Sequence, residues 1–560
     1  MMIEQTPNVG CYRLASNVKL TQTKDGGIVA LCDYPLRVIP LNPTLARLLS
    51  LCSEERTCEQ LAQLMHQPLK RIEALCDQLR WKSLLEAGPV AAPTTWPPIS
   101  IVIPSYNRAK KLERCLRTLF SLDYPHSLIE ILVVDDASTD NTLSMLYQLV
   151  HEAKTHDIQL RSIRHIQQQG VAYSRNTGAE AATHDLIAYI DSDCVASSTW
   201  LTELVPLFQN SCIAAVGGMI RGYNRQSMLG RYEDTCSSLY MGTRPQQVRL
   251  EGPLTYLPTA NLLIRRSIWQ QLNGFAPLTQ GEDVDFCRRI LLTGAHIRYI
   301  PQGIIYHDYR TTLPSFLKIR VAYASAEAAL LQRHPTERRI LVLPPEQATF
   351  AGLVLGGLWG MLYFLLFLEK KRLLRHYGRG RPIESSELVA PLTVRVGGMT
   401  GACPCHALSA PIVSQPPFTL PFSSLGTLIS TLLLTFLGTR NRLQKVRQQH
   451  VPIGITTVFN ATLRGNLAYT YHLCRHLTRY YTLPLLLLGG IFFPLIILIA
   501  IMLCVVISVD YWRLKPSMSL VEYAFCAMLN DCAYEVGVVQ GCIKHRIWKP
   551  LVPIVKNKFK

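Results

Sequence analysis

The sequence has few charged side chains, and acidic residues are scarce in its C-terminal third. Charged residues make up 17% of the 560 residues, whereas apolar residues make up 48%. Residues 369–560 contain 22 Lys and Arg but only 7 Asp and Glu, so they hold +15 of the formal net charge of +18. Global disorder is excluded by the apolar content, and the basic excess is local. We therefore expect no nucleic acid among the partners.

A signal peptide and an ordered cysteine pattern are also lacking. The segment MMIEQTPNVG contains no basic run followed by an apolar run, so no secretory signal is expected. The 17 cysteines have no regular spacing, which predicts free thiols in a reducing compartment. Cys403 and Cys405 with His406 provide too few ligands for a closed zinc site, which needs four.

Changes in composition divide the chain into three parts joined by one linker. Residues 1–90 combine two strand-like segments with about three amphipathic segments, which predicts a winged-helix-like module. This module has 10 basic and 9 acidic residues, so peptide binding is favoured over DNA binding. A proline-rich linker at 91–98 leads to residues 99–345, where short β-branched runs alternate with amphipathic segments. This alternation predicts an α/β domain with a mainly parallel sheet.

Residues 346–560 are predicted to form a membrane-associated helical region. Their apolar stretches 350–368, 418–437 and 483–509 are each long enough to cross about 30 Å of hydrocarbon. Basic residues directly follow the first two stretches. If every stretch crossed the membrane, successive flanks would lie on opposite sides, so the basic flanks could not all be cytoplasmic. Glycine pairs and a proline permit broken or re-entrant helices. The sequence leaves open whether the stretches span the membrane or dip into it.

Carboxylates follow two predicted strands at the point where ligands bind in parallel α/β sheets. Asp191 and Asp193 come directly after LIAYI, and this spacing suits a Mg²⁺ or Mn²⁺ ion that also binds substrate phosphates. The alternative is a solvated turn. Asp135 and Asp136 follow ILVV, where one carboxylate could accept a hydrogen bond from a base. A helix N-cap is the alternative there.

Two further motifs have both a functional and a structural interpretation. Pro104 and Tyr106 follow ISIVI, where an aromatic face could stack on a flat base, although a proline-containing turn has the same pattern. Glu282 and Asp283 follow Gly281 at an expected helix start. They are either exposed first-turn residues or candidates for a general base.

Seven blocks between residues 99 and 334 give these motifs a common context. They are IVIPSYNR, EILVVDDASTD, GVAYSRNTGAEAA, IDSD, NLLIRRSIWQQLNGF, GEDVDFCRRILLTG and IPQGIIYHD. In this order they resemble the family 2 glycosyltransferases, which have a GT-A fold and use nucleotide-diphospho-sugars. The resemblance implies nucleoside contacts at Pro104, Tyr106 and Asp135, with Asp136 as the alternate carboxylate. It also implies that Arg175 lies near the pyrophosphate.

The same resemblance implies a metal site and a general base. Asp193 and His307 would ligate a divalent cation, Mn²⁺ or Mg²⁺, and Asp191 would face the ribose or the metal. Asp283 would deprotonate the acceptor hydroxyl in an inverting transfer, while Glu282 would orient the acceptor or cap the helix. The cation and the arginine would stabilise charge on the leaving group.

The flanking segments resemble those of a narrower group. VKLTQTKDGGIVALC and the residues after it resemble the small peptide-binding domain of the pyrroloquinoline-quinone pathway. With LNDCAYEVGVVQGCIKHRIW near the other end, the chain resembles the mycofactocin-system glycosyltransferases. This implies UDP-glucose as donor, a peptide-derived redox cofactor precursor as acceptor, membrane lipid as a partner, and a cell-membrane location with the catalytic domain facing the cytoplasm.

Two other functions are compatible with parts of the sequence. The hydrophobic C-terminal region equally suits transfer to a lipid or a cell-envelope glycan. A non-catalytic peptide- or glycan-binding membrane protein is disfavoured, because every carboxylate that the chemistry needs is present. The Q-x-x-R-W motif of processive synthases is lacking, so we expect the addition of one or a few sugars.

Overall fold

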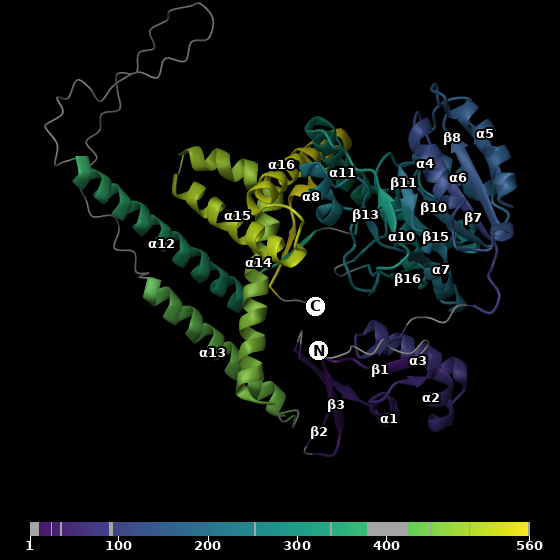
Figure 1. The fold of residues 1–560 in the computed structure, drawn as a ribbon. Coiled ribbons are helices and arrows are strands. Elements are labelled where there is room, and N and C mark those ends of the chain that lie inside the picture. The colour runs from purple at the N-terminus through teal and green to yellow at the C-terminus, as the bar shows by residue number, and fades with distance from the viewer. Residues whose placement is uncertain are drawn as a thin grey trace, which may run out of the picture.

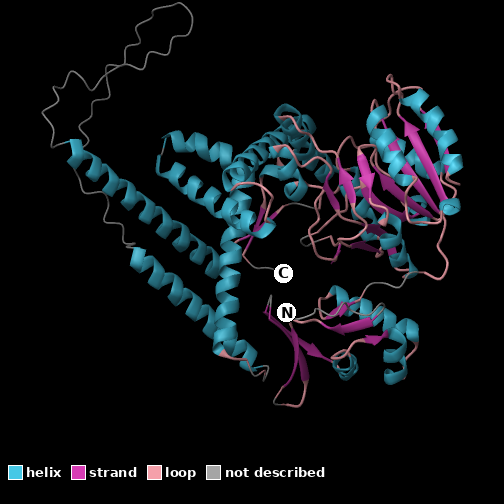
Figure 2. Ribbon diagram, in the orientation of Figure 1, coloured by secondary structure: helices cyan, strands magenta, loops and turns pink. Residues whose placement is uncertain are grey.

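The structure is a computed structural model in which a small N-terminal module, an α/β domain and a set of long helices follow one another (Figures 1 and 2). It describes residues 11–557 apart from 24, 34–35, 89–92, 251–253, 337–338, 378–423, 449–450, 452 and 492. Cys403, Cys405 and His406 therefore lie outside the described residues.

The N-terminal module has the three predicted helices but six strands instead of two. Its elements are β1 Cys11–Leu14, β2 Val18–Gln22, β3 Ile28–Asp33, β4 Leu36–Leu41, α1 Pro43–Leu51, β5 Arg56–Thr57, α2 Cys58–Met65, α3 Leu69–Trp81 and β6 Leu85–Ala87. Strands β2, β3 and β4 form one antiparallel sheet, and β1 lies between β5 and β6 in another. The prediction merged β1 and β2 into one strand-like segment and missed β4, β5 and β6. Strands β5 and β6 are short and pair with β1 across tens of residues, which local periodicity does not reveal.

The α/β domain confirms the predicted mainly parallel sheet. Its eight strands have the order β14-β16-β12-β15-β10-β7-β8-β9, and β14 and β15 are the antiparallel members. The strands are β7 Ile99–Ser105, β8 Ile129–Asp135, β9 Gln159–Arg164, β10 Leu186–Ile190, β12 Ile213–Gly217, β14 Gln246–Gln247, β15 Asn261–Arg265 and β16 His296–Tyr299. The helices are α4 Ala109–Leu119, α5 Thr142–Thr155, α6 Val171–Ala181, α7 Trp200–Leu204, α8 Met228–Cys236, α9 Arg266–Gln271 and α10 Glu282–Leu292.

The central strands are buried on both faces, which explains their continuous apolar runs. Ile101 and Ile103 belong to the hydrophobic cluster on one face of the sheet, and Val102 belongs to the cluster on the other. Strands covered by helices on both sides have this composition. A smaller sheet pairs β11 Cys194–Ala196 and β13 Ile220–Gly222 with β17 Ile305–His307.

Long helices follow the α/β domain. They are α11 Leu313–Arg333, α12 Pro345–Tyr377, α13 Ser424–Gln448, α14 Ile455–Ile491, α15 Phe493–Leu514 and α16 Leu520–His545, and β18 Ile340–Val342 pairs in parallel with β19 Ile554–Lys556. The third apolar stretch is not one continuous helix, because α14 ends and α15 begins within it. A Cβ added at Gly489 would lie 2.6 Å from Ile496 Cγ1, so the glycine permits the close approach of the two helices.

Among the described residues, one helical segment is apolar and long enough to cross a membrane. It is Leu495–Leu514, and a third of its apolar window is buried against the rest of the protein. The structure thus confirms a hydrophobic helical region after the α/β domain.

Candidate active site

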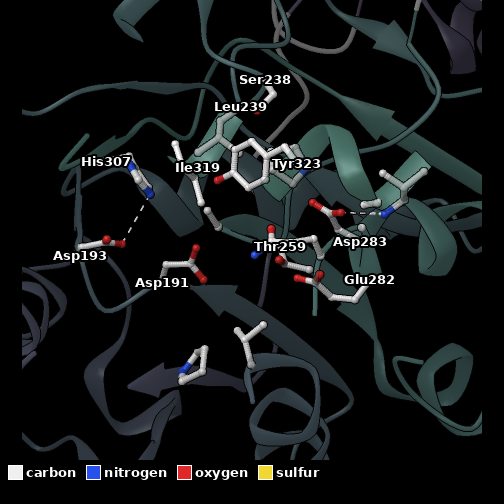
Figure 3. Close-up of a pocket in the computed structure, with 18 of the residues that line it drawn as sticks. Asp191, Asp193, Ser238, Leu239, Thr259, Glu282, Asp283, His307, Ile319 and Tyr323 are labelled. Atoms are coloured by element: carbon white, nitrogen blue, oxygen red, sulfur yellow. Dashed lines mark hydrogen bonds and ion pairs between the residues drawn. The ribbon is translucent and has the colours of Figure 1, made fainter. Parts of the chain in front are cut away.

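A cavity of about 580 Å³ opens where the sheet, α10 and α11 meet, and nine of the ten predicted site residues line it. The nine are Pro104, Tyr106, Asp136, Arg175, Asp191, Asp193, Glu282, Asp283 and His307. Figure 3 shows Asp193 and His307 on one side, Glu282 and Asp283 on the other, and Asp191 between them. Asp135 does not belong to the lining.

The carboxyl ends of two neighbouring parallel strands form one edge of the cavity. Ser105 of β7 pairs in register with Asp135 of β8, so the loops that follow these strands lie together. Asn107 ties the two loops because its N–H donates to Ser138 Oγ at 2.8 Å and its Oδ1 accepts from Thr139 N–H at 2.7 Å. This arrangement leaves Tyr106 39% exposed at the cavity, as a stacking surface requires.

The two carboxylates after β8 have different surroundings. Asp135 is buried, accepts from Ser138 N–H at 3.0 Å and pairs with Arg164 Nη1 at 3.0 Å. Asp136 accepts from the N–H groups of Gln169 and Gly170, both at 2.8 Å. Gly170 precedes α6, so Asp136 fixes the start of the helix that carries the cavity arginine.

Arg175 connects the two sides of the cavity. Its Nη2 lies 2.8 Å from Asp191 Oδ1, and its Nη1 lies 2.6 Å from Glu282 Oε1. The side chain is nearly fully buried, and burial would lower the pKa of the Arg175 guanidinium. The two carboxylates outweigh burial and raise this pKa above its ordinary value, so Arg175 holds a fixed positive charge.

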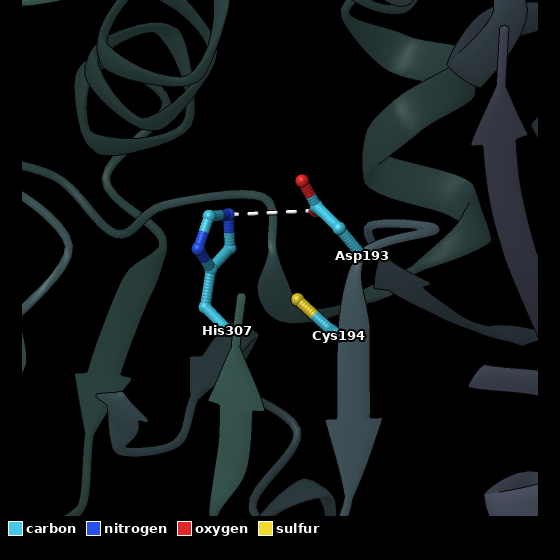
Figure 4. A group of neighbouring side chains, drawn as sticks. All are labelled: Asp193, Cys194 and His307. Atoms are coloured by element: carbon cyan, nitrogen blue, oxygen red, sulfur yellow. Dashed lines mark ion pairs between the residues drawn. The ribbon is translucent and has the colours of Figure 1, made fainter. Parts of the chain in front are cut away.

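Asp193 and His307 are brought together by the small sheet. Cys194 of β11 pairs with His307 of β17, and His307 Nε2 lies 3.5 Å from Asp193 Oδ1 (Figure 4). Asp193 Oδ1 and His307 Nδ1 are both buried without a hydrogen-bond partner. Among the described residues, Asp193, Cys194 and His307 are the one group close enough to share a metal ion. A carboxylate and an imidazole with unused ligand atoms fit a divalent cation completed by substrate oxygens.

Two arginines outside the set predicted from the sequence also face Asp193. Arg108 Nη1 lies 2.5 Å from Asp193 Oδ2, and Arg310 Nη1 lies 3.9 Å from the same oxygen. Burial would raise the pKa of Asp193, but His307 and then Arg108 hold it below its ordinary value. Asp193 is therefore ionised, as a metal ligand must be.

Glu282 and Asp283 begin α10. Gly281 precedes them with φ of 81°, and a Cβ there would lie 3.0 Å from Leu330 Cδ1, so the sharp entry into the helix requires glycine. Burial, followed by the charge of Glu282, raises the pKa of Asp283 to about 7, while Arg175 acts in the opposite direction. A carboxyl group with a pKa near 7 is suited to accept a proton at physiological pH.

The next acidic residue of α10 attaches this helix to α11. Asp285 is fully buried, and it pairs with Arg289 at 2.8 Å, Arg333 at 2.9 Å and His334 at 2.9 Å. Because Arg333 and His334 lie at the end of α11, this cluster fixes the orientation of the helix that begins with Glu282 and Asp283.

Helices after the α/β domain close the remaining side of the cavity. Tyr323 and Glu327 of α11, Arg479 of α14 and Tyr534 of α16 line it. None of these four is predicted from the sequence as a site residue, because no motif or strand end marks them. Only the packing of α16 on α11 and of α14 on α16 brings the last two to the cavity.

Comparison with known protein families agrees with these observations. Residues 100–272 match the family model described as "Glycosyl transferase family 2". Over 250 residues the chain is 32% identical to the pre-mycofactocin glycosyltransferase of Mycobacterium tuberculosis. The aligned region covers 44% of this chain and 50% of that protein. It is also 28% identical over 220 residues to the glycosyltransferase AglE of Haloferax volcanii, covering 39% of this chain and 69% of AglE. The chain thus spans about half the length of the first of these relatives.

Solved structures give weaker matches. The mannosyltransferase PcManGT from Pyrobaculum calidifontis, in complex with GDP-Man and Mn²⁺, aligns with a TM-score of 0.36 and 20% identity. That alignment covers 44% of this chain and 67% of the mannosyltransferase. The family match and the observed sheet confirm the resemblance to family 2 glycosyltransferases and the α/β fold class.

Proposed function

We propose that this protein, in which residues 100–272 match the family 2 glycosyltransferase model, is a membrane-associated, metal-dependent, inverting glycosyltransferase. It moves glucose from UDP-glucose to a peptide-derived redox cofactor precursor of the mycofactocin type. One observation carries the proposal: a carboxylate–imidazole pair and a carboxylate with a pKa near 7 face each other across one cavity.

The nucleotide part of the donor binds at the ends of β7 and β8. Tyr106 stacks on the base, and Pro104 supports the turn that presents it. Asp136 lines the cavity but its oxygens hold the loop before α6, whereas Asp135 lies behind the lining. Both carboxylates therefore act by positioning the two loops around the nucleoside.

The pyrophosphate lies between Arg175 and the pair of Asp193 and His307. These two residues would hold a Mn²⁺ or Mg²⁺ ion, and Asp191 would face the ribose or the same ion. When bound, the ion supplies electrostatic stabilisation of the charge on the departing nucleoside diphosphate. Arg175 supplies a second fixed positive charge to that group.

Asp283 performs the proton transfer. Its carboxylate takes the proton of the acceptor hydroxyl while that oxygen forms a bond to the anomeric carbon. The bond between this carbon and the donor phosphate oxygen breaks on the opposite face, so the configuration inverts. Glu282 stays bound to Arg175 and orients it toward the leaving group.

The N-terminal module serves as the peptide-binding part. Its 10 basic and 9 acidic residues provide no electrostatic surface for nucleic acid. The similarity to a pre-mycofactocin glycosyltransferase over the catalytic domain supports a peptide-derived acceptor. The long helices hold the protein at the cell membrane with the catalytic domain on the cytoplasmic side.

A direct assay tests this function. The full chain in lipid nanodiscs is incubated with radiolabelled UDP-glucose and either a matured precursor peptide product or extracted membrane lipid, and products are identified by mass spectrometry. We expect glucose on the peptide-derived acceptor only. Transfer to lipid alone would favour the lipid or cell-envelope function that the exposed apolar helices also suit.

A further inference from the structure

The wall of the cavity beside Asp193 carries more positive than negative charge. Two arginines of the lining share this one carboxylate, because Arg108 Nη1 lies 2.5 Å and Arg310 Nη1 lies 3.9 Å from Asp193 Oδ2. Arg108 directly precedes α4, and Arg310 follows the end of β17. Two segments far apart in the chain therefore bring two guanidinium groups to one side of the cavity.

Among the described residues, no further carboxylate balances these two arginines. The neighbouring Asp308 is already paired with Lys111 at 3.1 Å and with Arg114 at 2.9 Å. No carboxylate oxygen other than those of Asp193 lies within 4.0 Å of Arg108 or Arg310. Four cationic side chains thus share two carboxylates on this wall.

The opposite wall of the cavity has the reverse balance. There Arg175 lies between two carboxylates, with Asp191 at 2.8 Å and Glu282 at 2.6 Å, and Asp283 follows Glu282 in the chain. The cavity therefore has a positive wall and an acidic wall. A ligand group with several negative charges is attracted to the positive one.

The two arginines have N–H groups left for a ligand. A guanidinium has five N–H donors in one plane, and Asp193 accepts from one nitrogen of Arg108. Among the described residues no hydrogen bond holds the Arg310 side chain, since its 3.9 Å approach to Asp193 is longer than a hydrogen bond. Both side chains are about a third accessible. Phosphate oxygens are acceptors that such a group binds with paired hydrogen bonds.

This pairing is compatible with the cation proposed at Asp193 and His307. The arginines approach Oδ2 of Asp193. The other oxygen, Oδ1, lies 3.5 Å from His307 Nε2 and is buried without a hydrogen-bond partner. The two oxygens of one carboxylate thus face different groups, and Arg108 can keep its contact while Oδ1 serves as a ligand atom.

We propose that Arg108 and Arg310 bind the phosphate groups of the donor nucleotide and stabilise the charge that the diphosphate gains when the sugar leaves. The inference rests on the proposed function, because it names two further residues for the same donor. When the bond to the anomeric carbon breaks, its electron pair stays on the terminal phosphate oxygen, so the diphosphate gains one negative charge. Both arginines remain protonated. Positive charges that are already in position stabilise such a group without rearrangement.

Nucleotide binding without a divalent cation isolates the two arginines. The full chain in nanodiscs, with EDTA present, is titrated calorimetrically with UDP and with uridine. We expect wild type to bind UDP roughly tenfold or more tightly than uridine, as charge-assisted contacts to phosphate require. Arg108→Gln and Arg310→Gln should each reduce this preference and leave the affinity for uridine unchanged.

Two further variants make the comparison specific. Arg108→Lys should retain part of the preference for UDP, because the charge remains without the paired donors. Lys110→Gln, at an exposed position in the first turn of α4, should keep the wild-type preference. A loss in Lys110→Gln equal to that in Arg108→Gln would reduce the effect to general surface charge and overturn the proposal.

The alternative role for these arginines is to hold Asp193 in place. In that case both glutamine variants keep the wild-type preference for UDP in EDTA while their Mn²⁺ affinity falls, and the proposal is wrong. Equal or undetectable binding of UDP and uridine by wild type also overturns it. Thermal unfolding checks each variant, and if Arg108→Gln does not fold, Arg310→Gln decides. Failure of the proposed function is separate, because transfer to the peptide-derived acceptor is then absent while UDP binding still depends on the arginines.

Discussion

Glu282 and Asp283 are adjacent carboxylates whose surroundings give them different roles. Arg175 binds Glu282 at 2.6 Å, whereas Asp283 accepts a hydrogen bond from the N–H of Val284 and otherwise faces the cavity. Burial and the neighbouring charge raise the pKa of Asp283 to about 7. When two nearby carboxyl groups have different surroundings, their pKa values move apart, and the two groups can take different roles in acid–base catalysis.

Asp283→Asn should abolish sugar transfer and retain donor binding. An amide cannot accept the proton of the acceptor hydroxyl, and general base catalysis contributes roughly 10²- to 10⁴-fold to a rate. We expect a loss of this size in kcat, with the KM for the nucleotide sugar nearly unchanged. Asp123→Asn, an exposed position in the same domain, is the matched control. Wild-type transfer by Asp283→Asn would remove this residue from the mechanism.

The transfer rate should rise with pH through about 7. Asp283 must be deprotonated to act, and its pKa of about 7 places half-maximal activity there, with a plateau roughly one unit higher. Glu282→Gln removes the negative charge that raises this pKa and frees Arg175, so the midpoint should move to lower pH. A kcat profile between pH 5 and 9 measures both effects. A midpoint that stays in place would show that Glu282 does not act on the titrating group.

Asp193→Ala and His307→Ala should each weaken Mn²⁺ binding in the presence of UDP. Each substitution removes one of the two protein ligands proposed for the cation, so stimulation of transfer by Mn²⁺ or Mg²⁺ should fall with it. Calorimetric titration of Mn²⁺ provides a readout that does not depend on activity. Cys212→Ala, at an exposed cysteine, should retain wild-type metal affinity. Unchanged Mn²⁺ affinity in both variants would place the ion elsewhere.

At the scale of elements, the contact between α11 and α16 joins the catalytic domain to the C-terminal helices. Gly537 and Gly541 lie one turn apart on α16, and both approach backbone oxygens of α11. Small residues at this spacing allow two helices to approach closely. This contact explains how residues more than 200 positions apart line one cavity.

Gly537→Ala should destabilise this contact. The added Cβ would lie 2.4 Å from Val321 O, which is backbone and cannot rotate away, so the helices must separate. Overpacking of this kind costs roughly 1–3 kcal/mol. Gly352→Ala in α12 has open space around its Cβ and should be neutral or stabilising by up to about 1 kcal/mol. Thermal unfolding of both variants measures the difference, and equal melting temperatures would contradict the packing role.

At the scale of the whole molecule, charge and exposed apolar surface occur together in the C-terminal helices. One face of α13 exposes five large apolar side chains, each about half accessible: Leu428, Ile429, Leu432, Leu433 and Phe436. The same helix ends in a basic segment with Arg440, Arg442, Lys445 and Arg447. An apolar surface next to a basic one is suited to an anionic membrane surface.

Binding of the full chain to anionic vesicles should therefore depend partly on salt. Each basic residue near the surface contributes about 1 kcal/mol, and salt screens this attraction. The quadruple change of Arg440, Arg442, Lys445 and Arg447 to Gln should reduce the preference for anionic over neutral vesicles. Flotation assays at low and high salt measure the effect. Equal recovery of wild type and variant with anionic vesicles at low salt would contradict an electrostatic contribution.

The sequence alone determined the fold class and pointed to most of the proposed site residues that line the cavity. Alternating apolar runs and amphipathic segments encode the parallel sheet, and the polar residues after each run mark its ligand-binding edge, because both signals are local in the chain. Nine of the ten site residues predicted from these motifs and from the family resemblance line the cavity. Asp135 lies behind it because its pairing with Arg164 turns the carboxylate away.

Only the tertiary structure decided which distant residues meet. Asp193 and His307 become neighbours through the pairing of β11 with β17, and Arg479 and Tyr534 reach the cavity through the packing of α16 on α11. Strands β5 and β6 of the N-terminal module have the same origin, because both pair with β1. Such contacts depend on how segments far apart in the chain pair and pack against each other. The pattern of residues within one segment does not predict them.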